Sequence, residues 1–189
     1  METFAQILSI FAMLFLIASF QFKKQRSSII MQLIGCALFS LSYFWLGALM
    51  GAITNAINVV KNGIFTFKQK LKADHPAYLV LFSALAIASY VLVFTVFDKE
   101  PTAVNFIVEL LPVIAVIVST ISFMSKDAKT VRRLNLINSP CWLTYNIVSF
   151  SIGGIICEVF CLSSTIIGII RLDRNKKQPE NNINENAKE

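Results

Sequence analysis

The chain has 189 residues, of which 56% are hydrophobic and 15% charged, and the charged residues occupy a few short intervals between long apolar runs. This pattern excludes an ordinary soluble domain and is typical of a polytopic membrane protein, because the apolar runs approach the roughly 20 residues that a bilayer-spanning helix needs. A net charge of +6 would suggest nucleic acid as the partner of a soluble chain. Here the basic residues lie beside apolar runs, so we expect the lipid bilayer as the partner and no nucleic acid.

Seven membrane-spanning helices are predicted, in an all-α fold of two three-helix units joined by a linker helix (3+1+3). The predicted helices cover residues 4–20, 28–46, 49–67, 78–97, 104–123, 134–150 and 152–170. The first unit comprises residues 1–67, the linker with the central fourth helix residues 68–103, and the second unit residues 104–170. Residues 171–189 are rich in Lys, Asn and Glu and poor in apolar residues, so we predict a disordered cytoplasmic tail.

Lys and Arg residues predict the orientation in the membrane. Nearly all of them follow the first, third, fifth and seventh predicted helices, whereas the opposite side has only Lys99, beside Asp98 and Glu100. Cytoplasmic loops carry an excess of Lys and Arg. We therefore expect a multi-pass protein of the bacterial inner membrane with its N-terminus outside and its C-terminus in the cytoplasm.

An offset of 103 residues relates the two predicted units. Few residues are identical under this offset, Gly51 and Gly154 among them, but the placement of charged and polar groups recurs. Three helices and one linker helix give both units the same direction through the membrane. The sequence thus predicts a parallel internal repeat, as in the SWEET transporters.

Polar side chains form one stripe on each of four predicted helices, and the stripes occupy corresponding positions in the two units. They consist of Gln32, Gly35, Cys36, Phe39 and Tyr43; of Gly51, Asn55, Asn58 and Asn62; of Asn135, Asn138, Ser139, Trp142 and Asn146; and of Gly154, Glu158, Cys161 and Thr165. Polar groups in hydrocarbon seek a partner helix or a water-filled cavity. We therefore expect the stripes to face the axis between the units, where they either line a solute pathway or hold helices together.

Three ionisable residues fall inside predicted spans: Lys61, Glu109 and Glu158. Such groups are costly at bilayer depth and commonly mark solute or proton pathways. Glu158 is the strongest candidate because it lies deepest and on a polar stripe, although a structural carboxyl is the alternative. The predicted pathway residues are Asn55, Asn58, Lys61, Glu109, Asn138, Trp142, Asn146 and Glu158.

Enzymatic chemistry has little support in the sequence. The only histidine, His75, falls in a predicted loop, and no nucleophile–base or metal-ligand set is visible. The four cysteines, Cys36, Cys141, Cys157 and Cys161, lack zinc-like spacing and are interpreted as packing residues. We therefore predict no catalytic residue, no metal and no cofactor.

Several segments resemble the bacterial inner-membrane YgjV family, whose biochemical role is not established. They include residues 22–26, 46–48 and 55–57 with Lys61, and in the second half residues 109–114, 117–120, 141–142, 145–146 and 151–154, ending in Glu158. The family is similar in layout to the SWEET and PQ-loop transporters, and this resemblance implies the same 3+1+3 fold. The Pro-Gln pair of the PQ-loop proteins is absent, since Phe20-Gln21 and Phe123-Met124 stand at its positions.

Two functions remain open. The first is a transporter of a small solute, unidentified from the sequence, with a polar site near mid-membrane between Asn55 and Glu158. The second is a membrane scaffold or assembly partner that transports nothing, for which a dry, fully packed axis is expected. A cavity that touches both Asn55 and Glu158 favours the first. The sequence is compatible with a homo-oligomer in either case.

Overall fold

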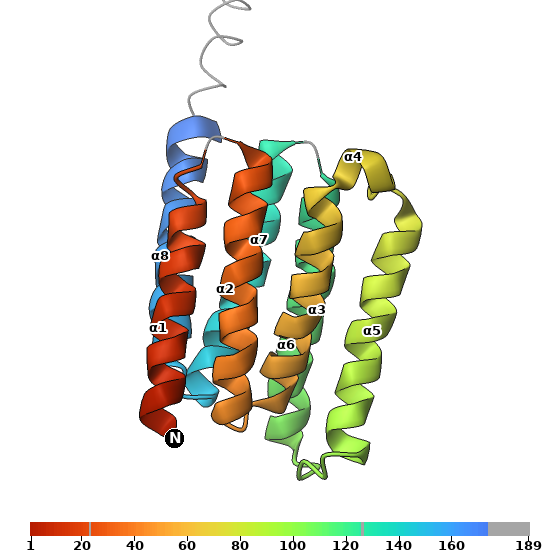
Figure 1. Ribbon diagram of the computed structural model, residues 1–189, viewed down its shortest axis with the longest axis vertical. Helices are drawn as coiled ribbons and strands as arrows, with labels where there is room; N and C mark the ends of the chain where they lie inside the picture. Colours follow the sequence, from red (N-terminus) through yellow and green to blue (C-terminus); the bar gives the residue numbers. More distant parts are fainter. Residues whose placement is uncertain (23, 126, 174–189) are drawn as a thin grey trace, which may run out of the picture.

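The computed structural model describes residues 1–22, 24–125 and 127–173, and within these ranges it contains helices and loops but no strand (Figure 1). The helices are α1 (Glu2–Ser19), α2 (Gln25–Trp45), α3 (Leu49–Thr66), α4 (Lys68–Leu71), α5 (Pro76–Thr95), α6 (Ala103–Met124), α7 (Ala128–Val148) and α8 (Ile152–Gly168), followed by the π-helical turn η1 (Ile169–Asp173). The all-α fold class is confirmed for the described residues. The predicted tail lies almost wholly outside them.

Five of the described helices are long and apolar enough to cross a membrane: α1, α2, α5, α6 and α8. The remaining long helices, α3 and α7, carry Asn55, Asn58, Asn135 and Asn138, which lower their hydropathy. Large apolar side chains such as Leu14, Ile87 and Ile107 are exposed on the bundle surface. An apolar surface around helices of this length fits a lipid environment.

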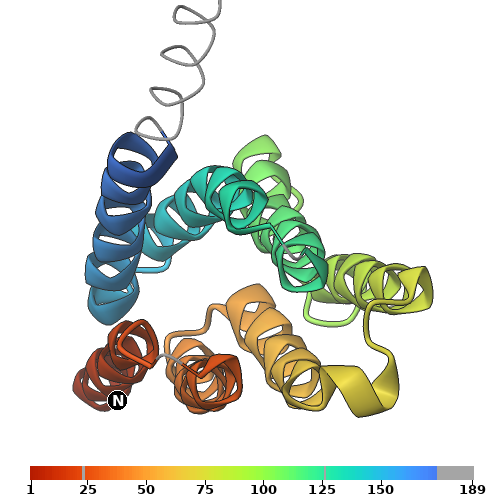
Figure 2. The same cartoon turned by 90° about the horizontal axis from the view of Figure 1, so that it is seen from above.

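The helices form two facing rows, seen along their axes in Figure 2. One row is α1, α2 and α3 in that order, and the other is α8, α7 and α6. The rows meet where α1 packs on α8 and where α3 packs on α6, and α5 packs against both helices of the second junction. In each unit, therefore, the first helix contacts the third helix of the other unit.

Both units run in the same direction, since α1 and α6 each start at the lower end of the bundle in Figure 1. The turns between the second and third helices are also alike. Gly47 follows α2 with φ +72°, and Phe150 follows α7 with φ +52°. After them, Ala48 N donates to Tyr43 O and Ser151 N donates to Asn146 O. These are helix ends of the Schellman type, in which a left-handed residue follows the last turn. Gly47 and Phe150 are 103 residues apart.

We call the end with the α1–α2, α3–α5 and α6–α7 loops the basic end, because Lys24, Arg26, Lys68, Lys70, Lys72, Lys129, Arg132 and Arg133 lie on or beside these loops. The N-terminus and the α5–α6 loop lie at the opposite end (Figure 1).

Five helices, α1, α2, α5, α6 and α7, begin earlier than predicted, and capping side chains account for the starts of α5 and α7. α7 starts at Ala128 rather than at residue 134, because the Asp127 carboxylate accepts hydrogen bonds from the N–H groups of Lys129 and Thr130. α5 starts at Pro76, where His75 Nδ1 accepts from Ala77 N. The prediction followed hydropathy, which does not register capping side chains outside the apolar run.

Candidate functional site

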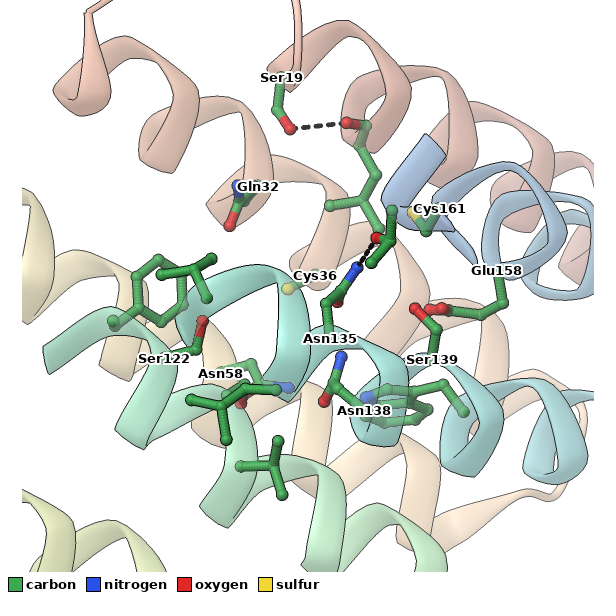
Figure 3. A pocket seen from close by; sticks show the side chains of 18 of the residues that line it. Ser19, Gln32, Cys36, Asn58, Ser122, Asn135, Asn138, Ser139, Glu158 and Cys161 are labelled. Carbon is green, nitrogen blue, oxygen red and sulfur yellow. Dashed lines mark hydrogen bonds between the residues drawn. The ribbon is translucent and has the colours of Figure 1, made fainter. Parts of the chain in front are cut away.

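A cavity of about 810 Å³ lies between the two rows of helices. It extends from Phe20, Ser125 and Gly168 near the basic end to Tyr43 and Asn146, in the last turns of α2 and α7. Figure 3 shows polar side chains from both units around it, including Gln32, Asn58, Asn135 and Glu158. The volume falls within the range usual for sites that bind small molecules.

The cavity wall repeats under the 103-residue offset. Every lining residue from α1–α3 or the loop after α1 has its counterpart among the lining residues of the second unit. The pairs are Leu16/Ser119, Ser19/Ser122, Phe20/Phe123, Gln32/Asn135, Cys36/Ser139, Phe39/Trp142, Tyr43/Asn146, Asn55/Glu158, Asn58/Cys161, Lys61/Ser164 and Asn62/Thr165. The two units therefore present the same positions to one shared space, although most side chains differ.

Repeat counterparts also touch each other. The Tyr43 hydroxyl donates a short hydrogen bond to Asn146 Oδ1, and these residues are 103 positions apart. Corresponding points can meet only where the halves are closest to the axis that relates them. The Tyr43–Asn146 pair thus lies on the approximate twofold axis of the repeat.

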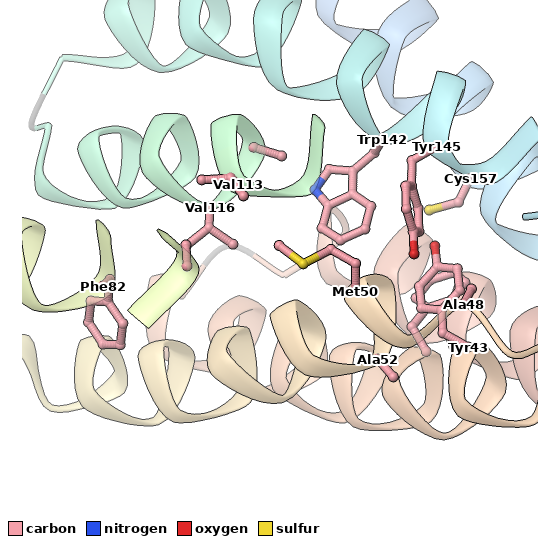
Figure 4. Close-up of a cluster of buried hydrophobic side chains, with 14 of the residues drawn as sticks. Tyr43, Ala48, Met50, Ala52, Phe82, Val113, Val116, Trp142, Tyr145 and Cys157 are labelled. Atoms are coloured by element: carbon pink, nitrogen blue, oxygen red, sulfur yellow. The ribbon is translucent and has the colours of Figure 1, made fainter. Parts of the chain in front are cut away.

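An aromatic cluster closes the cavity at this end, and we call Tyr43, Trp142 and Tyr145 the floor (Figure 4). The ring centroid of Tyr43 lies 6.3 Å from that of Trp142 and 5.8 Å from that of Tyr145. All three residues are buried. Tyr145 also accepts a hydrogen bond from Gly51 N at 2.7 Å, which links α7 to the start of α3.

Gly51 and Gly154 are required by the close packing of the floor. A Cβ atom at Gly51 would meet Tyr145 Cε1 at 2.6 Å and Tyr43 Cγ at 3.0 Å, and one at Gly154 would meet the side-chain amide of Asn146. Each glycine therefore makes room for a floor or axis residue of the adjoining helix.

Two ionisable side chains of opposite sign border the cavity from different units. Lys61 on α3 is 1% exposed, donates from Nζ to Ser119 Oγ, and lies 5.4 Å from the Phe123 ring centroid. Glu158 on α8 lies with its carboxyl beside the Ser139 hydroxyl (Figure 3). Glu158 is only half-buried because its side chain borders the open space. Among the described residues, neither charge forms an ion pair.

Several amides on the wall have unused acceptors. The Oδ1 atoms of Asn58, Asn62 and Asn138 are buried and have no hydrogen-bond partner in the part of the chain that the structure describes. Asn62 donates weakly to Cys36 Sγ at 3.7 Å, and Asn55 Nδ2 donates to Gly51 O at 2.9 Å. Buried acceptors are nearly always satisfied by protein, water or a ligand, so each of these oxygens has capacity for one further hydrogen bond after a small movement of its side chain.

Seven of the eight predicted pathway residues line this cavity: Asn55, Asn58, Lys61, Asn138, Trp142, Asn146 and Glu158. The cavity also touches both Asn55 and Glu158, the feature expected of a pathway. Glu109 is not among the lining residues. It is 3% exposed and pairs with Lys99 Nζ at 2.7 Å near the opposite end.

The position of Glu109 has a counterpart in the first unit. Under the 103-residue offset it corresponds to Gln6, which accepts from Ile152 N at 3.0 Å and donates to Phe150 O at 2.6 Å. Gln6 thus joins α1 to the start of α8, and Glu109 occupies the equivalent place on α6 beside α3. Its sequence signal, a charge in an apolar run, does not distinguish a helix junction from a cavity.

Residues that the prediction omitted also shape the cavity. Tyr43 and Tyr145 form the floor, and Arg132 reaches the wall near the basic end. Tyr43 lies on a predicted stripe and is the repeat counterpart of Asn146, so the offset could have identified it. For Tyr145, which contacts Gly51 in the other unit, the sequence offers no comparable signal.

Comparison with known proteins places the chain in a family. The family described as Imp-YgjV, bacterial inner membrane protein, matches residues 3–176. The chain belongs to this family. The inner membrane protein YgjV of Escherichia coli (strain K12) is 30% identical over 158 residues, which cover 84% of this chain and 75% of that protein. No solved structure matches the chain. The resemblance to YgjV is thereby confirmed, and the protein is a multi-pass protein of the bacterial inner membrane.

Proposed function

We propose that this YgjV-family protein transports a small solute through the cavity between its two three-helix units. Seven spans cross the bilayer in two parallel units, with the polar faces of α3 and α7 turned to the cavity and apolar side chains such as Val60 and Ile137 turned outward. The basic end faces the cytoplasm and the N-terminus lies outside, in accord with the distribution of Lys and Arg.

A single observation carries this proposal: the cavity extends from the basic end and stops at a closed floor. A transporter must expose one site alternately to the two sides of the membrane. Access from the basic end with the floor closed corresponds to a state that faces the cytoplasm. Opening outward requires the Tyr43–Asn146 and Tyr145–Gly51 hydrogen bonds to break, and both join one unit to the other.

The repeat supports rocking of the units as the motion. Among the described residues, the contacts between the rows are concentrated at the α1–α8 junction, at the α3–α6 junction with α5, and at the floor. The helices within each row pack continuously. Each unit can therefore move as a body against the other, and the axis through Tyr43 and Asn146 relates the two movements.

We assign binding rather than catalysis to the polar wall, whose amides and opposite charges suit hydrogen bonding and charge pairing.

The test compares metabolites in cells and medium for strains that lack the protein, produce it, or produce Glu158→Gln. We expect the wild type to shift the distribution of at least one small solute, and Glu158→Gln to accumulate normally in the membrane but not to cause this shift. Glu100→Gln, an exposed change at the opposite end, serves as the control. If wild type and Glu158→Gln shift the same solutes equally, Glu158 is not part of the pathway; if no solute shifts, the transport proposal fails.

A further inference from the structure

The opposite charges of Lys61 and Glu158 in the cavity indicate which class of solute it binds. Lys61 is on the wall of the first unit and Glu158 on the wall of the second, and both border the same space. Lys61 Nζ contacts the neutral Ser119 hydroxyl and lies over the Phe123 ring, with the Cys36 thiol nearby. Glu158 faces the neutral Ser139. Among the described residues, neither side chain is thus bound to an opposite charge.

Charges in such surroundings select a ligand that neutralises them. An uncompensated charge in a low-dielectric site is costly, and binding that supplies its partner is correspondingly favoured. A neutral polyol would leave both charges unpaired. A simple amine would leave Lys61 unpaired, and a simple carboxylate would leave Glu158 unpaired. Only a solute with both an ammonium and a carboxylate compensates both walls.

The unused acceptors favour the same class of solute. Asn58, Asn62 and Asn138, which line the cavity, have buried carbonyl oxygens that accept from no donor among the described residues. An ammonium group brings three N–H donors and no acceptor, so it can satisfy Glu158 together with a wall amide. Figure 3 shows Asn138 and Glu158 on the same side of the cavity, with Ser139 between them.

The register of the repeat gives the solute an orientation. Glu158 corresponds to Asn55, and Lys61 lies six residues beyond Asn55 toward the basic end, or about 9 Å along the helix axis. The ammonium therefore points toward the floor and the carboxylate toward the basic end.

We infer that the cavity binds a small zwitterionic solute, of which a free amino acid is the simplest form, with its ammonium at Glu158 and its carboxylate at Lys61. This inference rests on the proposed transport function and specifies its substrate class.

Thermal unfolding of the purified protein provides the binding test. The probes are an equimolar mixture of the twenty standard L-amino acids, the same mixture as N-acetyl derivatives, the same mixture as methyl esters, and glucose. A ligand that binds the folded state raises the unfolding midpoint with concentration. We expect the free amino acids to act at concentrations at least tenfold lower than the N-acetyl derivatives, which lack the ammonium, and the esters, which lack the carboxylate. Equal effects of free and blocked mixtures, or no effect of the free mixture at millimolar concentration, would overturn the inference.

Variants of Glu158 and Lys61 test which side chain binds the ammonium and which binds the carboxylate of the solute. Glu158→Gln is expected to remove the preference for free over N-acetylated amino acids, and Lys61→Met to remove the preference over methyl esters. Lys61→Arg keeps the positive charge and should keep the preference over esters. Glu100→Gln and Lys24→Met alter exposed charges of the same kinds outside the cavity. If both cavity variants lose both preferences equally, or fail to fold, the wild-type comparison of blocked and free mixtures still decides the inference.

Uptake into liposomes containing the protein separates this inference from the transport proposal. Amino-acid binding without uptake would leave the substrate class intact and overturn transport. Uptake of glucose or of an amine with no preference for zwitterions would leave transport intact and overturn the substrate class. Uptake of free amino acids but not of their blocked derivatives supports both.

Discussion

At Gly153 the backbone of α1 occupies the space that any larger side chain would need. The three atoms nearest to an added Cβ are Ser9 O, Ser9 C and Ile10 N, all of them backbone atoms. Gly153 N also donates to Ser9 Oγ at 3.2 Å. Because no rotamer change can relieve such a contact, α1 and α8 can adjust only by moving apart.

We therefore predict that Gly153→Ala destabilises the protein by about 1–3 kcal/mol, as overpacking commonly does, and lowers its thermal unfolding midpoint in detergent. Gly63→Ala is the matched control, since the nearest atom to its Cβ, Leu33 Cδ1, is at an ordinary 3.8 Å. Helix propensity alone favours alanine at Gly63. Equal midpoints for the two variants would show that the α1–α8 junction tolerates separation.

Single residues also show what the sequence can and cannot predict about the site. Asn55, Asn58 and Glu158 were identifiable because a polar group on an apolar helix is costly unless it faces a cavity or a partner. Glu109 obeys the same rule but meets Lys99 instead. Hydropathy and periodicity give the face of a helix that is polar, but not which neighbouring element supplies the partner.

Among the elements, α7 differs most from its prediction. Asp127 Oδ2 accepts from the Thr130 hydroxyl at 2.7 Å and from Thr130 N at 2.9 Å, and Oδ1 accepts from Lys129 N at 3.2 Å. The Thr130 hydroxyl, then the backbone N–H groups, hold the pKa of the Asp127 carboxyl below its usual value. Because of this cap, α7 begins before the apolar run from which the helix was predicted.

The cap predicts a pH dependence that belongs to this turn. Because folding lowers the pKa of the Asp127 carboxyl, the cap stabilises the folded protein when the pH is above the unfolded-state pKa of about 3.9. This stabilisation is lost as the pH falls through the lower pKa of the folded state. We expect Asp127→Ala to speed hydrogen exchange at the Lys129 and Thr130 amides at neutral pH, and acid to do so in the wild type. Asp127→Asn, which retains an N-cap acceptor, should stay protected and change less with acid. Unaltered exchange in Asp127→Ala would contradict this role.

The helices α3 and α7 illustrate a second limit of sequence analysis at this scale. Both were predicted from the alternation of loops, yet their composition alone does not qualify them as membrane spans. The polar residues that disqualify them line the cavity instead. Their position between apolar neighbours depends on tertiary packing, which no window of sequence contains.

For the whole molecule, the proposed topology is tested with reporters. A reporter fused after Glu189 or inserted near Lys70 is expected to report the cytoplasm, and one inserted near Lys99 the outside. These positions follow from seven spans with the basic end inside. An external signal from the Glu189 fusion would exclude an odd number of spans with the N-terminus outside.

One-sided access to the cavity is tested with the native cysteines. Cys36 and Cys161 line the cavity, whereas Cys157 is buried outside it, and all three are free thiols. In single-cysteine variants, a membrane-impermeant maleimide should label Cys36 and Cys161 at least tenfold faster in inside-out than in right-side-out vesicles. Cys157 should remain slow in both. Faster labelling of Cys36 from outside would mean that the floor is open or the orientation reversed.

The contact between Tyr43 and Asn146 has a consequence for how such a protein can originate. Two separate copies of one three-helix unit, paired about the same axis, would bring identical residues together there. A glutamate at the position of Glu158 would then face its own copy across the cavity, as would a lysine at the position of Lys61. Duplication within one chain removes this constraint, since Asn55 stands opposite Glu158 in the repeat and Ser164 opposite Lys61. Joining the halves through α5 thus allows the cavity to have two different sides, and hence to recognise a molecule with two different ends.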